Sequence, residues 1–280
     1  MTNRILFLGP KGSYSDIVKE KFEHLFKDSF TYEAMDSIYQ IAKMLETSEQ
    51  NNYFAILPIE NSIEGIVRET QDCLITLSQK DYKIVAETII PIEHCLIGHR
   101  NKENAHTIIS HPQAIAQCRE YIYNTWGNNI SIHHVVSTSS AVKSLTKKDD
   151  TIVAIGNKYC AETYNVPIIE SNINDKKNNT TRFILLGKVK PQKADKNKVS
   201  ITFSTENKAG ALNKVLNILE KYEINMSYID SRPSRKELGE YVFYVDFAGH
   251  IEDSNITLAL IEIQKQTNML EILSDGAFYV

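Results

Sequence analysis

Arg4-Ile5-Leu6-Phe7-Leu8 is a short apolar stretch, and Gly9-Pro10-Lys11-Gly12-Ser13-Tyr14-Ser15 is the polar loop that follows it. A helical pattern continues from there over about residues 16–26. The same order of strand, loop and helix recurs through residues 1–190, with further strands predicted at 53–57, 83–90, 95–98, 107–110, 130–136, 151–155 and 183–186. Such alternation predicts an α/β fold with a largely parallel sheet. Ligands bind such sheets where the carboxyl ends of strands enter loops.

The last third of the chain follows a different pattern. A polar, lysine-rich stretch at 188–198 contains a proline and cannot bury much surface, so we place a linker at 191–198. Beyond it, strands are predicted at 199–205, 224–230, 241–247 and 270–273, with helices near 212–219 and 255–266. This βαββαβ order is ferredoxin-like. It predicts a second domain over residues 199–280, whose open sheet edge could pair with another subunit.

Composition excludes several classes of function. The 280 residues carry a net charge of −4, and 42% of them are apolar. Nucleic-acid binding is disfavoured because it needs clustered Lys and Arg. The sequence contains no apolar stretch of the roughly 20 residues that a membrane helix requires, and no signal peptide, so we expect a cytoplasmic protein. The four cysteines form no CxxC pair or zinc pattern, and we expect no metal site.

Four predicted strand-to-helix junctions carry small hydroxyl or amide side chains. They begin at Gly9, Pro58, Ser110 and Ser137. Such residues commonly cap helices, which is the simpler interpretation of any single junction. Four junctions in one α/β unit instead suggest a site for a small anion, because backbone N–H groups at helix starts attract negative charge. Neither GxGxxG nor GxxxxGK[ST] occurs, so nucleotide-phosphate binding is poorly supported.

A fifth segment, residues 175–186, ends a polar run with Thr181 and Arg182 and then enters a strand. It is either a solvated loop before an edge strand or part of the site. In the second case the planar guanidinium of Arg182 would bind a carboxylate, and Thr181 would donate its hydroxyl to a substrate oxygen.

These segments together resemble prephenate dehydratase, over nearly the whole chain and in the family's order. The motifs are Gly9-Pro10-x-Gly12-Ser13-Tyr14-Ser15, Pro58-x-Glu60-Asn61-Ser62-x-x-Gly65-x-Val67, Ser110-His111-Pro112-Gln113-Ala114-x-x-Gln117-Cys118, Ser137-Thr138-x-x-Ala141 and Asn179-Thr180-Thr181-Arg182-Phe183. The C-terminal part resembles the family's ACT domain, through Gly210-Ala211-Leu212, Ile224-Asn225, Asp230-Ser231-Arg232-Pro233 and Tyr241-x-Phe243-x-x-Asp246-x-x-Gly249-His250.

The resemblance implies a two-lobed, periplasmic-binding-protein-like catalytic domain, with lobe 1 at residues 1–80 plus 166–190 and lobe 2 at 81–165. The implied reaction converts prephenate to phenylpyruvate and needs no cofactor. Thr181 and Arg182 are the expected catalytic residues, and Arg182 would either hold a substrate carboxylate or lock a loop through Glu60 or Glu64. His111 is a weaker candidate acid. The expected substrate-binding residues are Asn61, Ser62, Ser110, Gln113, Ser137, Thr138 and Phe183.

The resemblance also implies feedback regulation by L-phenylalanine at the ACT domain of a homodimer or homotetramer. The expected effector-binding residues are Gly210, Ala211, Leu212, Asn225, Asp230, Ser231, Arg232 and Pro233. Asp16, Asp230 and the C-terminus depart from the family pattern, with Asp230 in place of a usual Glu. We also expect no chorismate mutase domain in front of the catalytic part. Arogenate dehydratase and a non-catalytic amino-acid or dicarboxylate sensor are the alternative functions.

Overall fold

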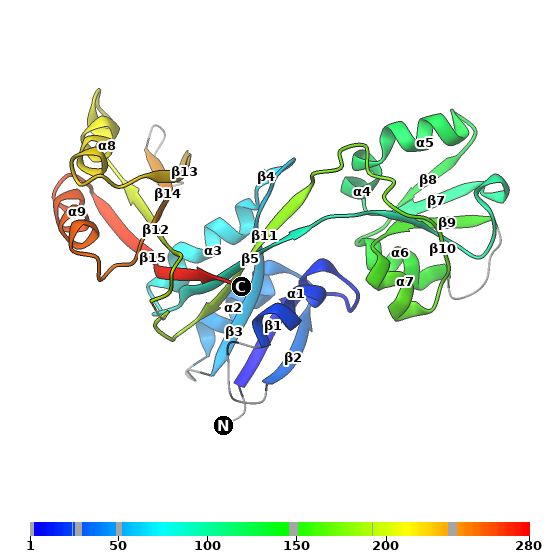
Figure 1. The fold of residues 1–280 in the computed structure, drawn as a ribbon, viewed down its shortest axis with the longest axis horizontal. Coiled ribbons are helices and arrows are strands. Elements are labelled where there is room, and N and C mark those ends of the chain that lie inside the picture. The colour runs from blue at the N-terminus through cyan, green and yellow to red at the C-terminus, as the bar shows by residue number, and fades with distance from the viewer. Residues whose placement is uncertain are drawn as a thin grey trace.

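The computed structural model describes residues 3–23, 25, 30–48, 52–145, 151–191, 193–234 and 240–280. Two sheets organise it. One has the strand order β13-β14-β12-β15-β5-β11-β3-β1-β2, with β4 paired to β3, and the other has the order β10-β6-β9-β7-β8. Figure 1 shows an elongated molecule with the C-terminal domain at one end, the second sheet at the other, and the N-terminal strands between them.

The central part of the large sheet forms lobe 1. Strand β1 (Asn3–Leu8) is parallel to β2 (Phe30–Met35) and to β3 (Tyr53–Asn61), whereas β11 (Thr180–Gly187) is antiparallel to both β3 and β5 (Lys83–Pro91). The sheet is therefore mixed rather than largely parallel, because the chain returns from lobe 2 along β11. The short strand β4 (Gly65–Ile66) turns back onto β3.

Helices cover both faces of this sheet. Helix α1 (Tyr14–Glu23) packs over one face through Val18 and Phe22, while α2 (Ile38–Thr47) and α3 (Arg68–Ser78) cover the other. The side chain of Ser37 caps α2 by accepting a hydrogen bond from Gln40 N. Alternate residues of each strand thus enter separate hydrophobic cores, as the two-residue period of a strand requires.

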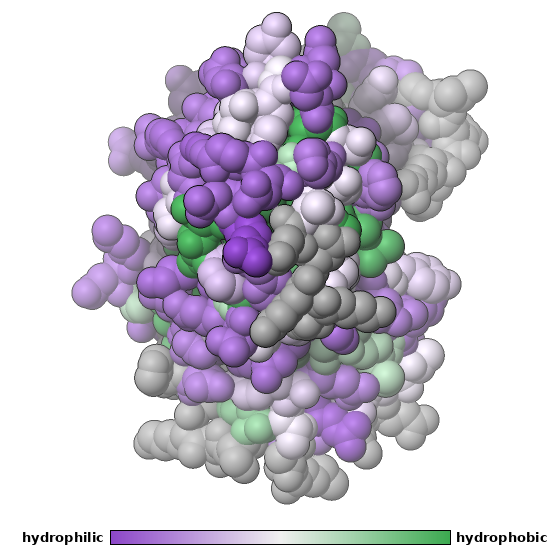
Figure 2. Space-filling view, turned by 90° about the vertical axis from the view of Figure 1, so that its right-hand side faces the viewer, coloured by the Kyte–Doolittle hydropathy of each residue, from purple (hydrophilic) through white to green (hydrophobic). Residues whose placement is uncertain are grey.

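Lobe 2 is built on the smaller sheet. Strand β7 (Thr107–Ser110) is parallel to β8 (Ser131–His134) and β9 (Ile152–Gly156), and β6 (Cys95–Ile97) is antiparallel to β9 and to β10 (Ile168–Glu170). The remaining elements are η1 (Lys102–Asn104), α4 (Pro112–Gln117), α5 (Arg119–Trp126), α6 (Thr138–Ser144) and α7 (Lys158–Tyr164). Figure 2 views the molecule from the lobe 2 end and shows a mainly hydrophilic face with small apolar patches.

The chain crosses between the lobes later than the sequence suggested. The expected crossings were near residues 80 and 166, but β5 still belongs to the lobe 1 sheet and β10 still belongs to the lobe 2 sheet. The crossings therefore fall at 92–94 and 171–179. Strand β5 stays in lobe 1 because it pairs with β11 along its whole length, from Lys83 to Pro91.

The C-terminal domain has the expected βαββαβ order: β12 (Asn197–Ser204), α8 (Ala211–Lys221), β13 (Met226–Pro233), β14 (Tyr241–Ala248), α9 (Ser254–Gln264) and β15 (Met269–Tyr279). Strand β15 is longer than predicted, and its end pairs in parallel with β5 through Phe278–Ala86 and Tyr279–Glu87. The sheet of this domain is therefore continuous with that of lobe 1 (Figure 1). In the described part of the chain, no helix combines the length and apolar character needed to cross a membrane.

Candidate functional site

A cavity of about 380 Å³ lies between the lobes, where loops from both sheets meet. Lobe 1 contributes the loop after β1, the ends of β2 and β3, and the start of β11, while lobe 2 contributes the starts of α4 and α6. Its polar lining residues are Ser13, Tyr14, Ser15, Asp36, Asn61, His94, His111, Gln113, Gln117, Ser137, Thr138 and Thr181. Among the residues that the structure describes, no Lys or Arg lines it.

Most of the residues expected to contact substrate meet at this cavity. Thr181 and the binding candidates Asn61, Gln113, Ser137, Thr138 and Phe183 all line it. Two candidates do not. The hydroxyl of the fully buried Ser110 donates to Ile155 O at 2.7 Å, and that of Ser62 accepts from Thr180 N at 2.9 Å. These two serines hold the backbone that surrounds the site.

The hydroxyl of Thr181 is oriented by Asn61. Asn61 Nδ2 donates to Thr181 Oγ1 at 2.9 Å and to Asn179 Oδ1 at 2.8 Å, while Asn61 Oδ1 accepts from the backbone N–H groups of Ile63 and Glu64, both at 3.0 Å. The Asn61 amide is therefore fixed with its nitrogen toward Thr181. Because Thr181 Oγ1 accepts from Asn61, its own hydrogen remains available to donate into the cavity.

A buried amide and imidazole network supports the same corner. Gln117 Oε1 accepts from Asn179 Nδ2 at 2.9 Å and lies 3.0 Å from His94 Nε2. Since Gln117 Oε1 can only accept, His94 Nε2 carries the hydrogen. Burial lowers the pKa of His94, so its ring is neutral near pH 7 and Nδ1 is an acceptor. His94 was missed from sequence because it lies in the crossover outside every motif used there.

The side chains at the starts of α4 and α6 cap their own helices. Ser137 Oγ accepts from Ser140 N at 3.0 Å, in a capping box at the start of α6. His111 Nδ1 accepts from Gln113 N at 3.3 Å at the start of α4, and burial together with nearby His134 lowers the pKa of His111. The capping interpretation thus accounts for the Nδ1 atom of His111 and for the oxygen of Ser137, although both residues line the cavity.

Arg182 lies on the opposite side of β11 from the cavity. Its Nε donates to Glu87 Oε2 at 2.6 Å, and its Nη1 lies 2.7 Å from Asp246 Oδ2 and 3.4 Å from Glu60 Oε2. Burial alone would lower the pKa of Arg182, but Asp246 and Glu87 raise it above its ordinary value. Of the two roles expected from sequence, the geometry therefore supports a contact to Glu60 and not a contact to a substrate carboxylate in this cavity.

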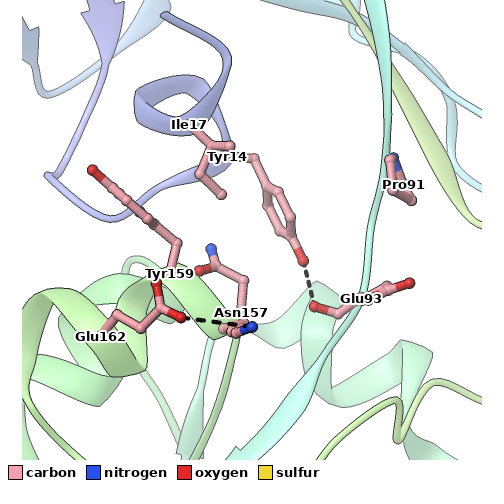
Figure 3. A pocket seen from close by; sticks show the side chains of 8 residues that line it. Tyr14, Ile17, Pro91, Glu93, Asn157, Tyr159 and Glu162 are labelled. Carbon is pink, nitrogen blue, oxygen red and sulfur yellow. Dashed lines mark hydrogen bonds and ion pairs between the residues drawn. The ribbon is translucent and has the colours of Figure 1, made fainter. Parts of the chain in front are cut away.

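The loop after β1 spans the two lobes. Backbone carbonyls of Lys11 and Gly12 accept hydrogen bonds from lobe 2, at 2.9 Å from Tyr164 Oη and at 3.0 Å from Asn157 Nδ2. A second cavity of about 280 Å³ lies beside this contact, between α1 and α7. Figure 3 shows Tyr14 of α1 reaching across it to the carbonyl of Glu93, at 2.7 Å. These hydrogen bonds hold the two lobes together along one side of the cleft.

The expected effector residues lie in two separate places of the single chain. Gly210, Ala211 and Leu212 form the start of α8, where the φ of Gly210 is +81°, and Asn225 is exposed after that helix. Asp230, Ser231, Arg232 and Pro233 instead face α3 across a cavity of about 420 Å³, where Asp230 accepts from Gln71 at 3.4 Å and Arg232 pairs with Asp72. The two groups do not line one cavity in this chain.

The fold is that of a class of proteins with two α/β lobes around a polar cleft, and here a ferredoxin-like domain is docked on one of the lobes. The prephenate dehydratase family profile matches residues 5–191, and the ACT domain profile matches residues 199–263. The chain belongs to the prephenate dehydratase family and carries an ACT domain, so it is a dehydratase of the lyase class.

Individual proteins agree with the family match. A prephenate dehydratase of Methanocaldococcus jannaschii is 42% identical over 98% of this chain and 97% of its own length. A solved prephenate dehydratase from Arthrobacter aurescens, in complex with L-Phe, superposes with a TM-score of 0.85 at 25% identity, covering 99% of this chain and 90% of that one. GqqA, described as a novel type of quorum quenching acylase, superposes with a TM-score of 0.81 at 25% identity and 97% coverage of both chains.

Proposed function

We propose that this enzyme converts prephenate to phenylpyruvate in phenylalanine biosynthesis. The ring hydroxyl of prephenate leaves as water after it takes a proton, and the ring carboxylate leaves as CO2 while its electron pair completes the aromatic ring. Aromatisation supplies the driving force, so the protein has to bind a dicarboxylate, assist the leaving hydroxyl and keep water out. The observation that carries the proposal is that Thr181 lines the cavity and that its oxygen accepts a hydrogen bond from Asn61, which leaves the hydroxyl hydrogen available to a substrate.

The composition of the cavity suits a decarboxylation. Its lining supplies hydroxyl and amide groups, together with Pro58, Ile92 and Phe183, and its described residues include no lysine or arginine. A cation beside the departing carboxylate would stabilise the charged ground state, which the reaction has to discharge. Hydroxyl and amide donors can hold the substrate in place without that cost.

A second candidate substrate is arogenate, which carries an ammonium group where prephenate has a keto oxygen. Asp36 lies at the cavity rim, with an exposed side chain that could pair with an ammonium group. The same carboxylate would disfavour a dianionic substrate. The two substrates can therefore be separated by kcat/KM and by the effect of Asp36→Asn, which should improve prephenate turnover and impair that of arogenate.

The test is a direct assay of the purified protein with prephenate and with arogenate in parallel. Appearance of phenylpyruvate together with CO2 from prephenate supports the proposal, and phenylalanine formed from arogenate supports the alternative. Binding of either compound without product would instead favour a sensor. The proposal fails if neither compound is consumed by a folded protein.

We also propose that L-phenylalanine binds the ACT domain and inhibits the enzyme. The support is the L-Phe complex of the Arthrobacter aurescens relative and the presence of the two candidate motifs, at 210–212 and 230–233. Since these motifs are apart within one chain, a shared effector site would need a second copy, which fits a homodimer or homotetramer. Calorimetry with L-phenylalanine and light scattering with and without it test both points. Absence of binding heat and of inhibition at millimolar ligand would contradict the regulatory proposal.

A further inference from the structure

Five charged side chains converge under β11, where the ACT domain meets lobe 1. They are Arg182, Glu87 and Glu60 from lobe 1, with Asp246 and Lys198 from the ACT domain. Glu87 and Asp246 are fully buried, and Arg182 bonds to both. Lys198 Nζ lies 2.7 Å from the second oxygen of Glu87. This charge cluster joins the two domains through ion pairs.

The charge cluster holds β11 from the side opposite the cavity. Thr181 and Arg182 are consecutive, so their side chains leave the strand on opposite faces. Thr181 lies in register with Asn61 on one neighbouring strand and with Ile90 on the other. A shift of β11 at Arg182 therefore also moves the backbone that carries the Thr181 hydroxyl. A displacement of about 1 Å at a reacting group can reduce a rate by roughly 100-fold.

We propose that Asp246 and Glu87 are positioning residues for the dehydration step, and that Asp246 links the state of the ACT domain to Thr181 through Arg182. This inference rests on the proposed function, since it assigns how that same site is aligned and regulated.

In the ACT domain, Asp246 is held by hydrogen bonds, and the strand next to it leads to the expected effector segment at 230–233. One Asp246 oxygen accepts from Ser200 Oγ at 2.6 Å, and the other pairs with Arg182, so both oxygens are committed. Asp246 is in register with Tyr228 on β13, and β13 continues to the 230–233 segment. A ligand that shifts β13 therefore acts on the strand that holds Asp246, and Asp246 contacts Arg182, the residue next to Thr181.

The test compares Asp246→Asn, which keeps the shape of the side chain but removes its charge, with Glu262→Gln, which removes the charge of a partly exposed ACT carboxylate paired with Lys221. We expect Asp246→Asn to lower kcat for prephenate by about 10-fold to 100-fold with a KM change of less than about threefold. L-phenylalanine should still bind in calorimetry, but its fold-inhibition should shrink. Glu262→Gln should match the unmodified enzyme in kcat, KM, L-phenylalanine binding and fold-inhibition.

A purely structural role for the charge cluster would lower stability without this split between kcat and KM. If Asp246→Asn folds and retains kcat and the full inhibition, the proposal is overturned. Glu87→Gln repeats the test from the catalytic side if Asp246→Asn does not fold. The same loss of kcat is expected, and unchanged kcat there likewise overturns the proposal.

Hydrogen exchange separates this inference from the proposed function. Amides of 180–183 should exchange faster in Asp246→Asn and Glu87→Gln than in Glu262→Gln, whatever substrate the enzyme uses. Faster exchange with no turnover of prephenate by the unmodified protein would reject the proposed function and keep the link. Unchanged exchange at 180–183 with normal turnover would reject the link and keep the function.

Discussion

Thr181 and Arg182 are neighbours in β11, but their side chains contact different partners on opposite faces of one sheet. The first accepts a hydrogen bond of 2.9 Å from Asn61 at the cavity, and the second makes ion pairs of 2.6 Å with Glu87 and 2.7 Å with Asp246 under the ACT domain. The pair therefore combines a candidate proton donor with a cation that does not face the cavity. Changes at Thr181 should therefore act mainly on the chemical step, whereas changes at Arg182 should also lower the stability of the fold.

Removal of the Thr181 hydroxyl should slow the chemical step. We expect Thr181→Ala to lower kcat for prephenate by roughly 10²–10⁴-fold with a modest change in KM, because a positioned donor to the leaving hydroxyl acts mainly in the transition state. Thr181→Ser keeps the hydroxyl and is the matched control, so it should recover much of the rate. Steady-state kinetics of both variants measure this, and a Thr181→Ala enzyme with normal kcat would remove Thr181 from the role.

Replacing the hydrogen-bond donor of Asn61 by an acceptor should impair the same Thr181 hydroxyl. Asn61→Asp replaces the amide that donates to Thr181 Oγ1 by a carboxylate, which can only accept, so the Thr181 hydrogen would turn toward it. The added negative charge at the cavity would also repel a dicarboxylate substrate. We therefore expect a lower kcat and a higher KM, measured on the folded variant. Wild-type values for both would show that Asn61 does not orient the donor.

The sequence allowed the architecture and most of the cavity lining to be predicted, because both depend on local patterns. The strand and loop at 4–15, for example, form β1, the cavity loop and α1 as expected. The βαββαβ order of the C-terminal part was likewise predicted from periodicity and is confirmed. Loops that follow parallel strands gather at one edge of their sheet, which places Gln113 and Ser137 together in lobe 2. In lobe 1, Thr181 begins β11 in antiparallel register with Asn61, which ends β3.

The contacts of individual side chains could not be predicted from the sequence. The two-residue period of a strand predicts that the side chains of Thr181 and Arg182 point to opposite faces of the sheet. The contact of Arg182 with Asp246, which is 64 positions away along the chain, depends on where the ACT domain docks. Ser110 satisfied every local criterion for a ligand residue, yet its hydroxyl is used by Ile155 O in the next strand. His94 entered the site only through the tertiary position of the crossover. These outcomes depend on long-range packing.

Loss of the Arg182 charge should destabilise the fold. Arg182→Met leaves the fully buried carboxylates of Glu87 and Asp246 with Lys198 as the nearest remaining cation of the charge cluster, and breaking a buried ion pair from one side costs about 3–5 kcal/mol. Urea unfolding followed by circular dichroism measures the loss. Lys221→Met breaks an exposed pair with Glu262 and should leave the midpoint unchanged. Equal midpoints for the two variants would contradict a stabilising role for Arg182.

Stability should fall in acid partly through Glu87. Burial acts to raise the Glu87 pKa, but Arg182 and Lys198 outweigh it and hold this pKa below its ordinary value of about 4.5. A carboxyl whose pKa is lower in the folded state stabilises the fold above the unfolded-state value, and that contribution is lost as the pH falls through the folded-state value. The unfolding free energy of the wild type should therefore exceed that of Glu87→Gln at pH 7, and the difference should shrink below about pH 4.5. The same comparison with exposed Glu220→Gln should show little change, and a Glu87 difference constant with pH would contradict the assignment.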